Sequence, residues 1–217
     1  MNTWVRFFEY VYSNSDRLLQ ATQEHIVYLV FIPVGMAILM AVPLGILCTR
    51  WPRGEKIIMG LASVLQTIPG LAMLAFMITL GLGIGYRPAI VALTLYALLP
   101  ILRNTYTGII GVDSSIKEAA TGMGMTNVQL LIEVEIPMAV PVILAGIRTA
   151  SVISVGAGTL AALIGAGGLG QFIITGLTQI RDHIILAGAI PSALLALIID
   201  RFLGKTEDWL TPRGLKL

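Results

Sequence analysis

Long runs of residues without formal charge dominate this sequence. Residues 26–48 and 57–86 contain no Asp, Glu, Lys or Arg, and most of their side chains are apolar. A helix needs about 20 such residues to cross the hydrocarbon core of a bilayer, where only helices and closed barrels satisfy their own backbone hydrogen bonds. The chain is therefore expected to be an all-α integral membrane protein.

The composition supports this class and excludes others. Of the 217 residues, 56% are hydrophobic and 12% are charged, whereas about 25% of residues are charged in soluble domains. The length suits one domain, and a net charge of +2 gives no reason to expect nucleic-acid binding. Cys48 is the only cysteine, so one chain cannot form a disulfide framework or a Cys-based metal site.

Charged residues, prolines and glycines divide the chain into about five expected transmembrane helices: 26–48, 58–80, 88–107, 137–164 and 180–203. The second is expected to kink at Pro69-Gly70, because proline removes a helical hydrogen bond. The domain organisation that follows is an N-terminal segment (1–24), a transmembrane domain (25–203) with a polar insert (114–137), and a tail (204–217).

The segment 1–24 is expected to lie in the membrane interface and not to be removed as a signal peptide. Charged residues interrupt it, beginning with Arg6 and Glu9, so it lacks a continuous apolar core. Trp4, Phe7 and Phe8 recur at helical spacing, as in a helix with one face among the lipid headgroups. A frayed terminus is the alternative.

The distribution of basic residues predicts the orientation. Nine lie on one expected face: Arg50, Arg53, Lys56, Arg103, Lys117, Arg201, Lys205, Arg213 and Lys216. Four lie on the other: Arg6, Arg17, Arg87 and Arg181. The positive-inside rule makes the first face cytoplasmic. The N-terminus is then outside, and the insert and the C-terminus are cytoplasmic.

The polar insert between the third and fourth expected spans has its own helical pattern. Two capping boxes, Ser115 with Glu118 and Thr126 with Gln129, predict two short helices. Pro137 is expected to stop the second. Such a segment at a membrane face suggests docking of a partner, and a hairpin that packs on the membrane face without a partner is the alternative.

No constellation of residues predicts catalysis. Residues 165–170 fit G-x-G-x-x-G, but they follow a membrane span and not a strand, so a flexible bend explains the glycines better than a dinucleotide site. His25 and His183 lie at span ends and are interpreted as interfacial residues. Glu133 and Glu135 are interpreted as a solvated helix face and not as an acid–base pair. Neither catalytic residues nor a metal site are expected.

One pattern in the insert resembles a known family. Glu118-Ala119-Ala120 is followed after three residues by Gly124, and after nine more by VEIP, which ends at Pro137. Permease subunits of bacterial ABC importers carry E-A-A, three residues, Gly, nine residues and I-x-L-P, from which this chain departs only by Val for Ile and Ile for Leu. The resemblance implies that these five residues belong to coupling helices that dock on a separate ATPase subunit.

A wider stretch resembles the permeases of importers for glycine betaine, carnitine and choline. The matching segments are QTIPG at 66–70, EAATGMGM at 118–125, PVILAGIRT at 141–149 and IGAGGLG at 164–170. The resemblance implies a type I ABC importer permease with a methionine-importer-like fold, in the bacterial cytoplasmic membrane. A permease for methionine or another amino acid is the alternative, because methionine importer permeases look similar in fold and also carry glycine-rich outer loops.

The same resemblance implies the partners. These are ATPase subunits that hold ATP and Mg, a second permease chain that is identical or paralogous, an extracytoplasmic binding protein or lipoprotein, and the lipid bilayer. No cofactor in this chain and no nucleic acid is expected. Two permease chains would enclose the translocation path, for which the candidates are Thr67, Pro69, Ser151, Ser154 and Gly158. Small residues on the fourth span also suit ordinary helix packing in lipid.

Two other function classes remain open. A secondary transporter would need no ATPase, but such proteins usually show coupling charges or repeated halves, and the sequence has no internal repeat. A membrane-embedded enzyme or assembly subunit would need a cofactor site, and no pattern in the sequence suggests one.

Arg148 is the only formal charge inside the fourth expected span. A cation there is costly unless it is paired, hydrated or able to reach the interface. Three interpretations follow: the side chain extends to the cytoplasmic interface, pairs within the bundle, or lines the path. A cation on the path would repel a quaternary ammonium substrate, which argues against direct substrate contact.

The predicted orientation can be tested by cysteine labelling. In a Cys48→Ala background, Ser115→Cys should react with a membrane-impermeant maleimide only from the cytoplasmic side, and Gln171→Cys only from outside. Labelling of intact cells and of inverted vesicles measures this. The reverse pattern would overturn the orientation and, with it, the assignment of an ATPase partner.

Overall fold

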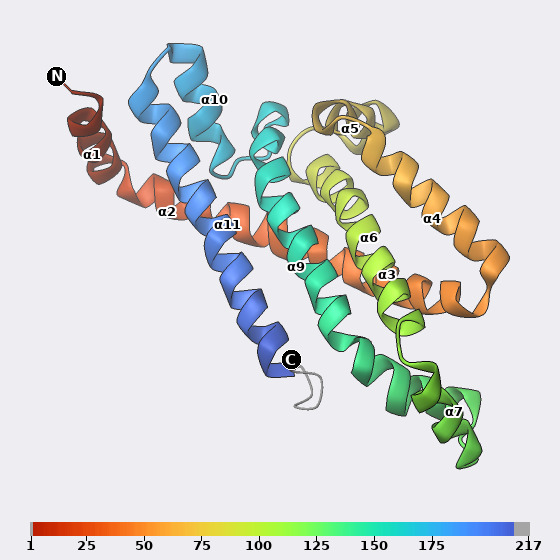
Figure 1. Cartoon of the computed structure of the whole chain (residues 1–217). Helices are drawn as coiled ribbons and strands as arrows, with labels where there is room; N and C mark the ends of the chain where they lie inside the picture. The colour runs from red at the N-terminus through yellow and green to blue at the C-terminus, as the bar shows by residue number, and fades with distance from the viewer. Residues whose placement is uncertain (1, 211–217) are drawn as a thin grey trace.

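Four long apolar helices and one bent helix pair form the membrane-spanning part of the computed structural model, which describes residues 2–210 (Figure 1). In chain order the elements are α1 (Thr3–Ser13), α2 (Ser15–Glu24), η1 (His25–Phe31), α3 (Ile32–Arg50), α4 (Pro52–Thr67), α5 (Gly70–Met77), η2 (Ile78–Leu82), α6 (Tyr86–Ile110), α7 (Ser114–Gly122), α8 (Asn127–Gln129), η3 (Leu130–Glu135), α9 (Ile136–Leu160), η4 (Ala161–Ile164), α10 (Gly170–Gln179) and α11 (Asp182–Leu210). The all-α fold with about five spans is confirmed. Residues 211–217 of the expected tail lie outside the described range.

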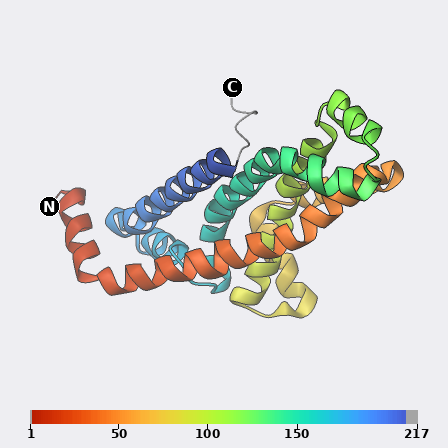
Figure 2. The same cartoon turned by 90° about the horizontal axis from the view of Figure 1, so that it is seen from below.

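The first span is longer than predicted. α2, the π-helical η1 and α3 form one continuous helix, Ser15–Arg50, which Figure 2 shows running from one end of the molecule to the other. The expected domain boundary at residue 24 falls within this helix and stays a prediction. α1 is helical, as its aromatic spacing predicted. Phe7 packs with Leu18 and with Ala187 of α11, whereas Trp4 and Phe8 are exposed.

The second span is broken, and the predicted single kinked helix over 58–80 is corrected. α4 already begins at Pro52, and it meets the α5–η2 segment at 101°, because Ile68 and Pro69 both adopt extended backbone angles. The Tyr96 hydroxyl on α6 donates a hydrogen bond to the Ile68 carbonyl oxygen, and Gln66 Nε2 donates to the Tyr96 carbonyl oxygen at 3.0 Å. The bond to Ile68 satisfies a backbone group that the break frees.

α6 is the central helix of the bundle. In its most apolar 18-residue stretch, 56% is buried within the chain, compared with 22–39% in the corresponding stretches of the other three long helices. A Cβ on Gly45 of α3 would lie 2.7 Å from Thr105, and one on Gly146 of α9 would lie 2.8 Å from the Pro100 carbonyl oxygen. Because only glycine permits such close approach, these two residues set how α3 and α9 pack on α6.

The polar insert and the N-terminal region lie at opposite ends of this bundle (Figures 1 and 2). The insert, with α7, protrudes at one end, and α1 and α10 lie at the other (Figures 1 and 2). α9 runs between the two ends.

Arg148 of α9 pairs with Asp200 of α11. Its Nε and Nη2 atoms donate to the two carboxylate oxygens at 2.5 and 2.7 Å, which is a bidentate geometry. Its Nη1 atom lies 3.7 Å from the Glu207 carboxylate. Of the three interpretations of Arg148, the structure therefore shows pairing within the bundle.

Removal of this pair should destabilise the bundle. The Arg148 and Asp200 side chains are 38% and 35% exposed, so solvent screens the pair, and Arg148→Ala or Asp200→Ala is expected to lower the stability of the bundle modestly. The double variant Arg148→Ala/Asp200→Ala should be little less stable than either single variant, because each single substitution already removes the interaction between the two side chains. Thermal denaturation in detergent and the yield of folded protein measure this. Normal yield of Arg148→Ala with a large change in apparent substrate affinity would instead place Arg148 on the path.

Candidate functional site

The insert begins with a capped helix, α7. The Asp113 carboxylate accepts a hydrogen bond from Ser115 N at 2.8 Å. Asp113 has the non-helical backbone angles of the N-cap, while Ser115 already lies in the first turn, so the predicted capping box at Ser115 is wrong. The hydrogen bonds from Ser115 hold the pKa of the Asp113 carboxyl below its usual range. The cap therefore contributes fully above the ordinary Asp pKa, and its contribution is lost as pH falls through the lowered value.

Thr126 opens the second helical piece of the insert, as predicted. Its Oγ1 accepts a hydrogen bond from Gln129 N at 3.3 Å, and Gln129 Oε1 accepts one from Thr126 N at 2.9 Å, which completes the capping box. Gly124, in the preceding turn, has φ of 87°, and no heavy atom lies within 4 Å of the position of a Cβ. The left-handed backbone, and not close packing, is what requires glycine there.

The helix does not end at Pro137, contrary to the sequence prediction. Pro137 lies in the first turn of α9, which continues from α8 through the π-helical η3 without a break. A π-helical turn widens the backbone before the proline, which relieves the clash of its ring with the preceding turn. Residues Asn127–Ile164 therefore form one helical element of 38 residues, about 55 Å long at 1.5 Å per residue.

The five residues of the E-A-A pattern differ in exposure. Glu118, Ala119, Gly124 and Pro137 are exposed, whereas Ala120 is 2% exposed. Four large apolar side chains of the insert are also exposed: Ile116 (38%), Met123 (73%), Val128 (64%) and Ile132 (58%). We call these eight exposed residues the coupling surface, after the docking role that the resemblance predicts for the insert. Large apolar side chains that are exposed outside the membrane spans are candidates for contact with another protein.

A buried carboxylate attaches the insert to the membrane helices. Glu135 of η3 is 2% exposed and forms an ion pair with Arg50 at the end of α3. Lys117 of α7 lies 3.8 Å from the other carboxylate oxygen and donates a hydrogen bond to the Ile109 carbonyl oxygen of α6 at 3.1 Å. Glu135 thus connects η3 with α3 and α7, and Lys117 extends the connection to α6.

The interpretations of Glu135 as solvated and of His25 as interfacial are wrong. Glu135, Ala139 and Ile143 are all buried and lie four residues apart, a spacing that places Glu135 on the buried stripe of the helix. His25 is fully buried, and its Nε2 lies 3.0 Å from the Val155 carbonyl oxygen. No local pattern predicts this contact, because it joins residues 130 positions apart.

The structure separates the five candidates for the translocation path. Ser151, Ser154 and Gly158 of α9 are buried within the chain, and a Cβ on Gly158 would lie 3.1 Å from His25 and from Leu29 of η1. Thr67 and Pro69 are exposed at the break between α4 and α5. Which of the five line a path between two chains stays a prediction.

The glycine loop at the far end of α9 packs against the first span. Gly167 and Gly168 have φ of 66° and 70°, the permissive dihedrals that the sequence predicted. A Cβ on Gly167 would lie 2.7 Å from the Tyr86 hydroxyl oxygen and 2.8 Å from Glu24 Oε2. Gly168 N donates a hydrogen bond to Glu24 Oε2 at 3.3 Å. Close approach therefore requires glycine here as well.

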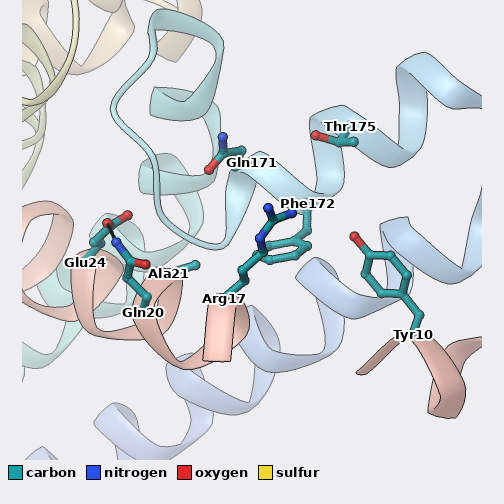
Figure 3. Close-up of a pocket in the computed structure, with 8 residues that line it drawn as sticks. All are labelled: Tyr10, Arg17, Gln20, Ala21, Glu24, Gln171, Phe172 and Thr175. Carbon is teal, nitrogen blue, oxygen red and sulfur yellow. Dashed lines mark hydrogen bonds between the residues drawn. The ribbon is translucent and has the colours of Figure 1, made fainter. Parts of the chain in front are cut away.

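A groove of about 380 Å³ lies beside this loop, between α2 and α10 (Figure 3). Its lining residues are Tyr10, Arg17, Gln20, Ala21, Glu24, Gln171, Phe172 and Thr175. Figure 3 shows the Arg17 side chain between the Glu24 side and the Tyr10 side of the groove. Among residues 2–210, no group of three or more His, Cys, Asp or Glu side chains could hold a metal ion.

Substitution of Glu135 should loosen the insert. Glu135→Gln leaves Arg50 and Lys117 without their carboxylate, and because Arg50 is 44% exposed the expected loss is about 2 kcal/mol, less than for a fully buried pair. Glu133→Gln, at an exposed position of the same turn, should cost less than about 0.5 kcal/mol. Thermal denaturation and hydrogen exchange of residues 114–135 measure this. Equal stability and equal protection in the two variants would contradict the attachment.

Comparison with known proteins identifies the family. Residues 41–210 match the family described as binding-protein-dependent transport system inner membrane component. Carnitine transport permease protein OpuCB of Listeria monocytogenes is 49% identical, and glycine betaine/carnitine/choline transport system permease protein OpuCB of Bacillus subtilis is 47% identical; each comparison covers 100% of this chain and 97% of the relative. Osmoprotectant import permease protein OsmW of Salmonella typhimurium is 43% identical over 95% of this chain and 98% of its own length.

Solved structures with the same fold are known. Two inward-facing crystal forms of the MetNI methionine ABC transporter match with TM-scores of 0.82 and 0.78, at 21% and 23% sequence identity. The matches cover 92% and 90% of this chain, and 99% and 97% of the matched chains. The chain therefore has the fold of a type I ABC importer permease and belongs to the family of binding-protein-dependent transport system inner membrane components.

Proposed function

We propose that this chain is the permease subunit of an ATP-driven, binding-protein-dependent importer for osmoprotectants, the quaternary ammonium compounds glycine betaine, carnitine and choline. The observation that carries the substrate class is the agreement among relatives that match over nearly their whole length, whose names specify these compounds. The resemblance to the methionine transporter, at 21% identity, concerns the fold and does not favour methionine as the substrate.

The coupling surface supports docking of a separate ATPase subunit. Its exposed apolar side chains, among them Met123 and Val128, would be covered by a partner protein. Glu118 adds an exposed carboxylate to this surface, and Ala119 and Gly124 add small exposed residues. ATP and Mg would be held by the ATPase subunits, and this chain would hydrolyse nothing itself.

The continuous helix Asn127–Ile164 provides a route from the ATPase to the path. Closure of an ATP-bound ATPase dimer would displace the insert, and the helix would carry that displacement to the glycine loop at the opposite end. A second permease chain, identical or paralogous, would complete the path between two such helices. In this arrangement the N-terminus is outside and the C-terminus is in the cytoplasm.

Reconstitution distinguishes this function from the alternatives. The chain is co-purified with its ATPase and partner permease, placed in proteoliposomes, and supplied with labelled glycine betaine and the purified binding protein. Uptake should require ATP and the binding protein, and excess unlabelled methionine should not compete. Uptake without ATP would indicate a secondary transporter, and competition by methionine would indicate an amino-acid importer.

Bulk on the coupling surface should uncouple the importer. Gly124→Trp adds an indole at an exposed site and is expected to reduce uptake at least tenfold, while membrane insertion and ATPase activity persist. Because any side chain at φ of 87° is strained, Gly124→Asn serves as the control: asparagine tolerates a left-handed backbone and should retain most of the uptake. Uptake by Gly124→Trp at the wild-type rate would refute the docking role of Gly124.

A further inference from the structure

The groove between α2 and α10 contains one acid and one arginine, and they differ in their contacts. Glu24 has both carboxylate oxygens occupied. Gln20 Nε2 donates to Oε1 at 3.0 Å, and Gly168 N donates to Oε2 at 3.3 Å. The Tyr86 hydroxyl also interacts with this carboxylate. Glu24 is therefore committed to holding the glycine loop.

Arg17 has no such commitment. It is exposed, and it forms no hydrogen bond or ion pair with any residue in the described range 2–210. Its guanidinium stands within the groove in Figure 3. Gln171 on α10 is exposed, and its side-chain amide likewise has no partner within that range. The groove thus presents a cation and an amide donor that the described fold does not use.

The walls of the groove are held by aromatic contacts. The ring of Tyr10 meets Phe172 edge-on with centroids 6.4 Å apart, and it meets His183 at 5.7 Å. Such contacts order the side chains that surround Arg17 before a ligand arrives. A preformed site with five guanidinium donors and a flanking amide fits a carboxylate, which accepts hydrogen bonds from both.

We infer that this groove receives an acidic side chain of the extracytoplasmic binding protein, with Arg17 as its principal contact. The inference rests on the proposed function and on the outside placement of the N-terminal end. Charge complementarity selects a carboxylate. Glu24 lines the groove and also bonds Gly168 of the glycine loop at the end of α9, so a partner seated there would lie next to the residue that holds this loop. A lipid phosphate could also accept hydrogen bonds from the Arg17 guanidinium, but lipid binding would not require a groove that is linked through Glu24 to the glycine loop.

The test measures affinity for the binding protein. The complete importer is placed in nanodiscs, and the dissociation constant of glycine betaine-loaded binding protein from the same organism is measured at low and at high salt. Arg17→Gln is expected to weaken binding about tenfold at low salt and Arg17→Glu more strongly, and both should flatten the salt dependence. Arg17→Lys should retain part of the affinity. Basal ATPase activity should be unchanged, whereas half-maximal stimulation should need more binding protein.

Arg181→Gln is the matched control, because Arg181 lines a neighbouring groove with Arg6 and His183; it should change the affinity less than twofold. Unchanged affinity of both Arg17→Gln and Arg17→Glu, while the wild-type importer binds and transports normally, would overturn this inference and leave the proposed function intact. An effect of Arg17→Gln that appears only in nanodiscs with phosphatidylglycerol would assign the groove to a lipid phosphate and also overturn it. A wild-type importer that neither binds the binding protein nor transports would remove the proposed function itself.

Discussion

The ion pair between the buried Glu135 carboxylate and the half-exposed Arg50 guanidinium fixes where the insert lies on the membrane helices. Burial of a carboxylate whose side chain is 3% exposed is costly without close cationic partners, and here they come from α3 and α7. Because Lys117 also bonds the carbonyl groups of Ile109 and Ile110 at the end of α6, moving the insert alone would separate several charged groups at once. We expect the insert to move together with the adjoining ends of these helices.

That unit extends along the whole of α9. The helix is continuous past Pro137, is paired with α11 through Arg148 and Asp200, and ends at a glycine loop whose Gly168 amide is bonded to Glu24. A displacement at the insert would therefore reach the groove around Arg17 mainly through one continuous helix, and less through a series of side-chain contacts. This arrangement joins the proposed site of ATPase docking to the proposed site of binding-protein docking.

The sequence predicted the features that depend on local chemistry and composition. Apolar runs gave the spans, and the Thr126 capping box was confirmed because its hydrogen bonds close within four residues. Asp113 was not predicted as the N-cap of α7, because the neighbouring Ser114 and Ser115 are also residue types that cap helices. Burial of His25 depends on a contact with Val155, and the sharp bend at Pro69 is accompanied by a bond from Tyr96 to Ile68. These partners lie far along the chain, so no local pattern could indicate them.

The most direct test of this account is a distance measurement along α9. Spin labels at Val128 and Leu163, both exposed, are introduced in a Cys48→Ala background, and a second pair joins Val128 to Leu71 of α5. Pulsed electron paramagnetic resonance compares the assembled importer with and without ATP. The account predicts that the Val128–Leu163 distance stays within about 2 Å, the scale of small helix shifts, while the Val128–Leu71 distance changes by more. A Val128–Leu163 distance that changes as much as the other would contradict it.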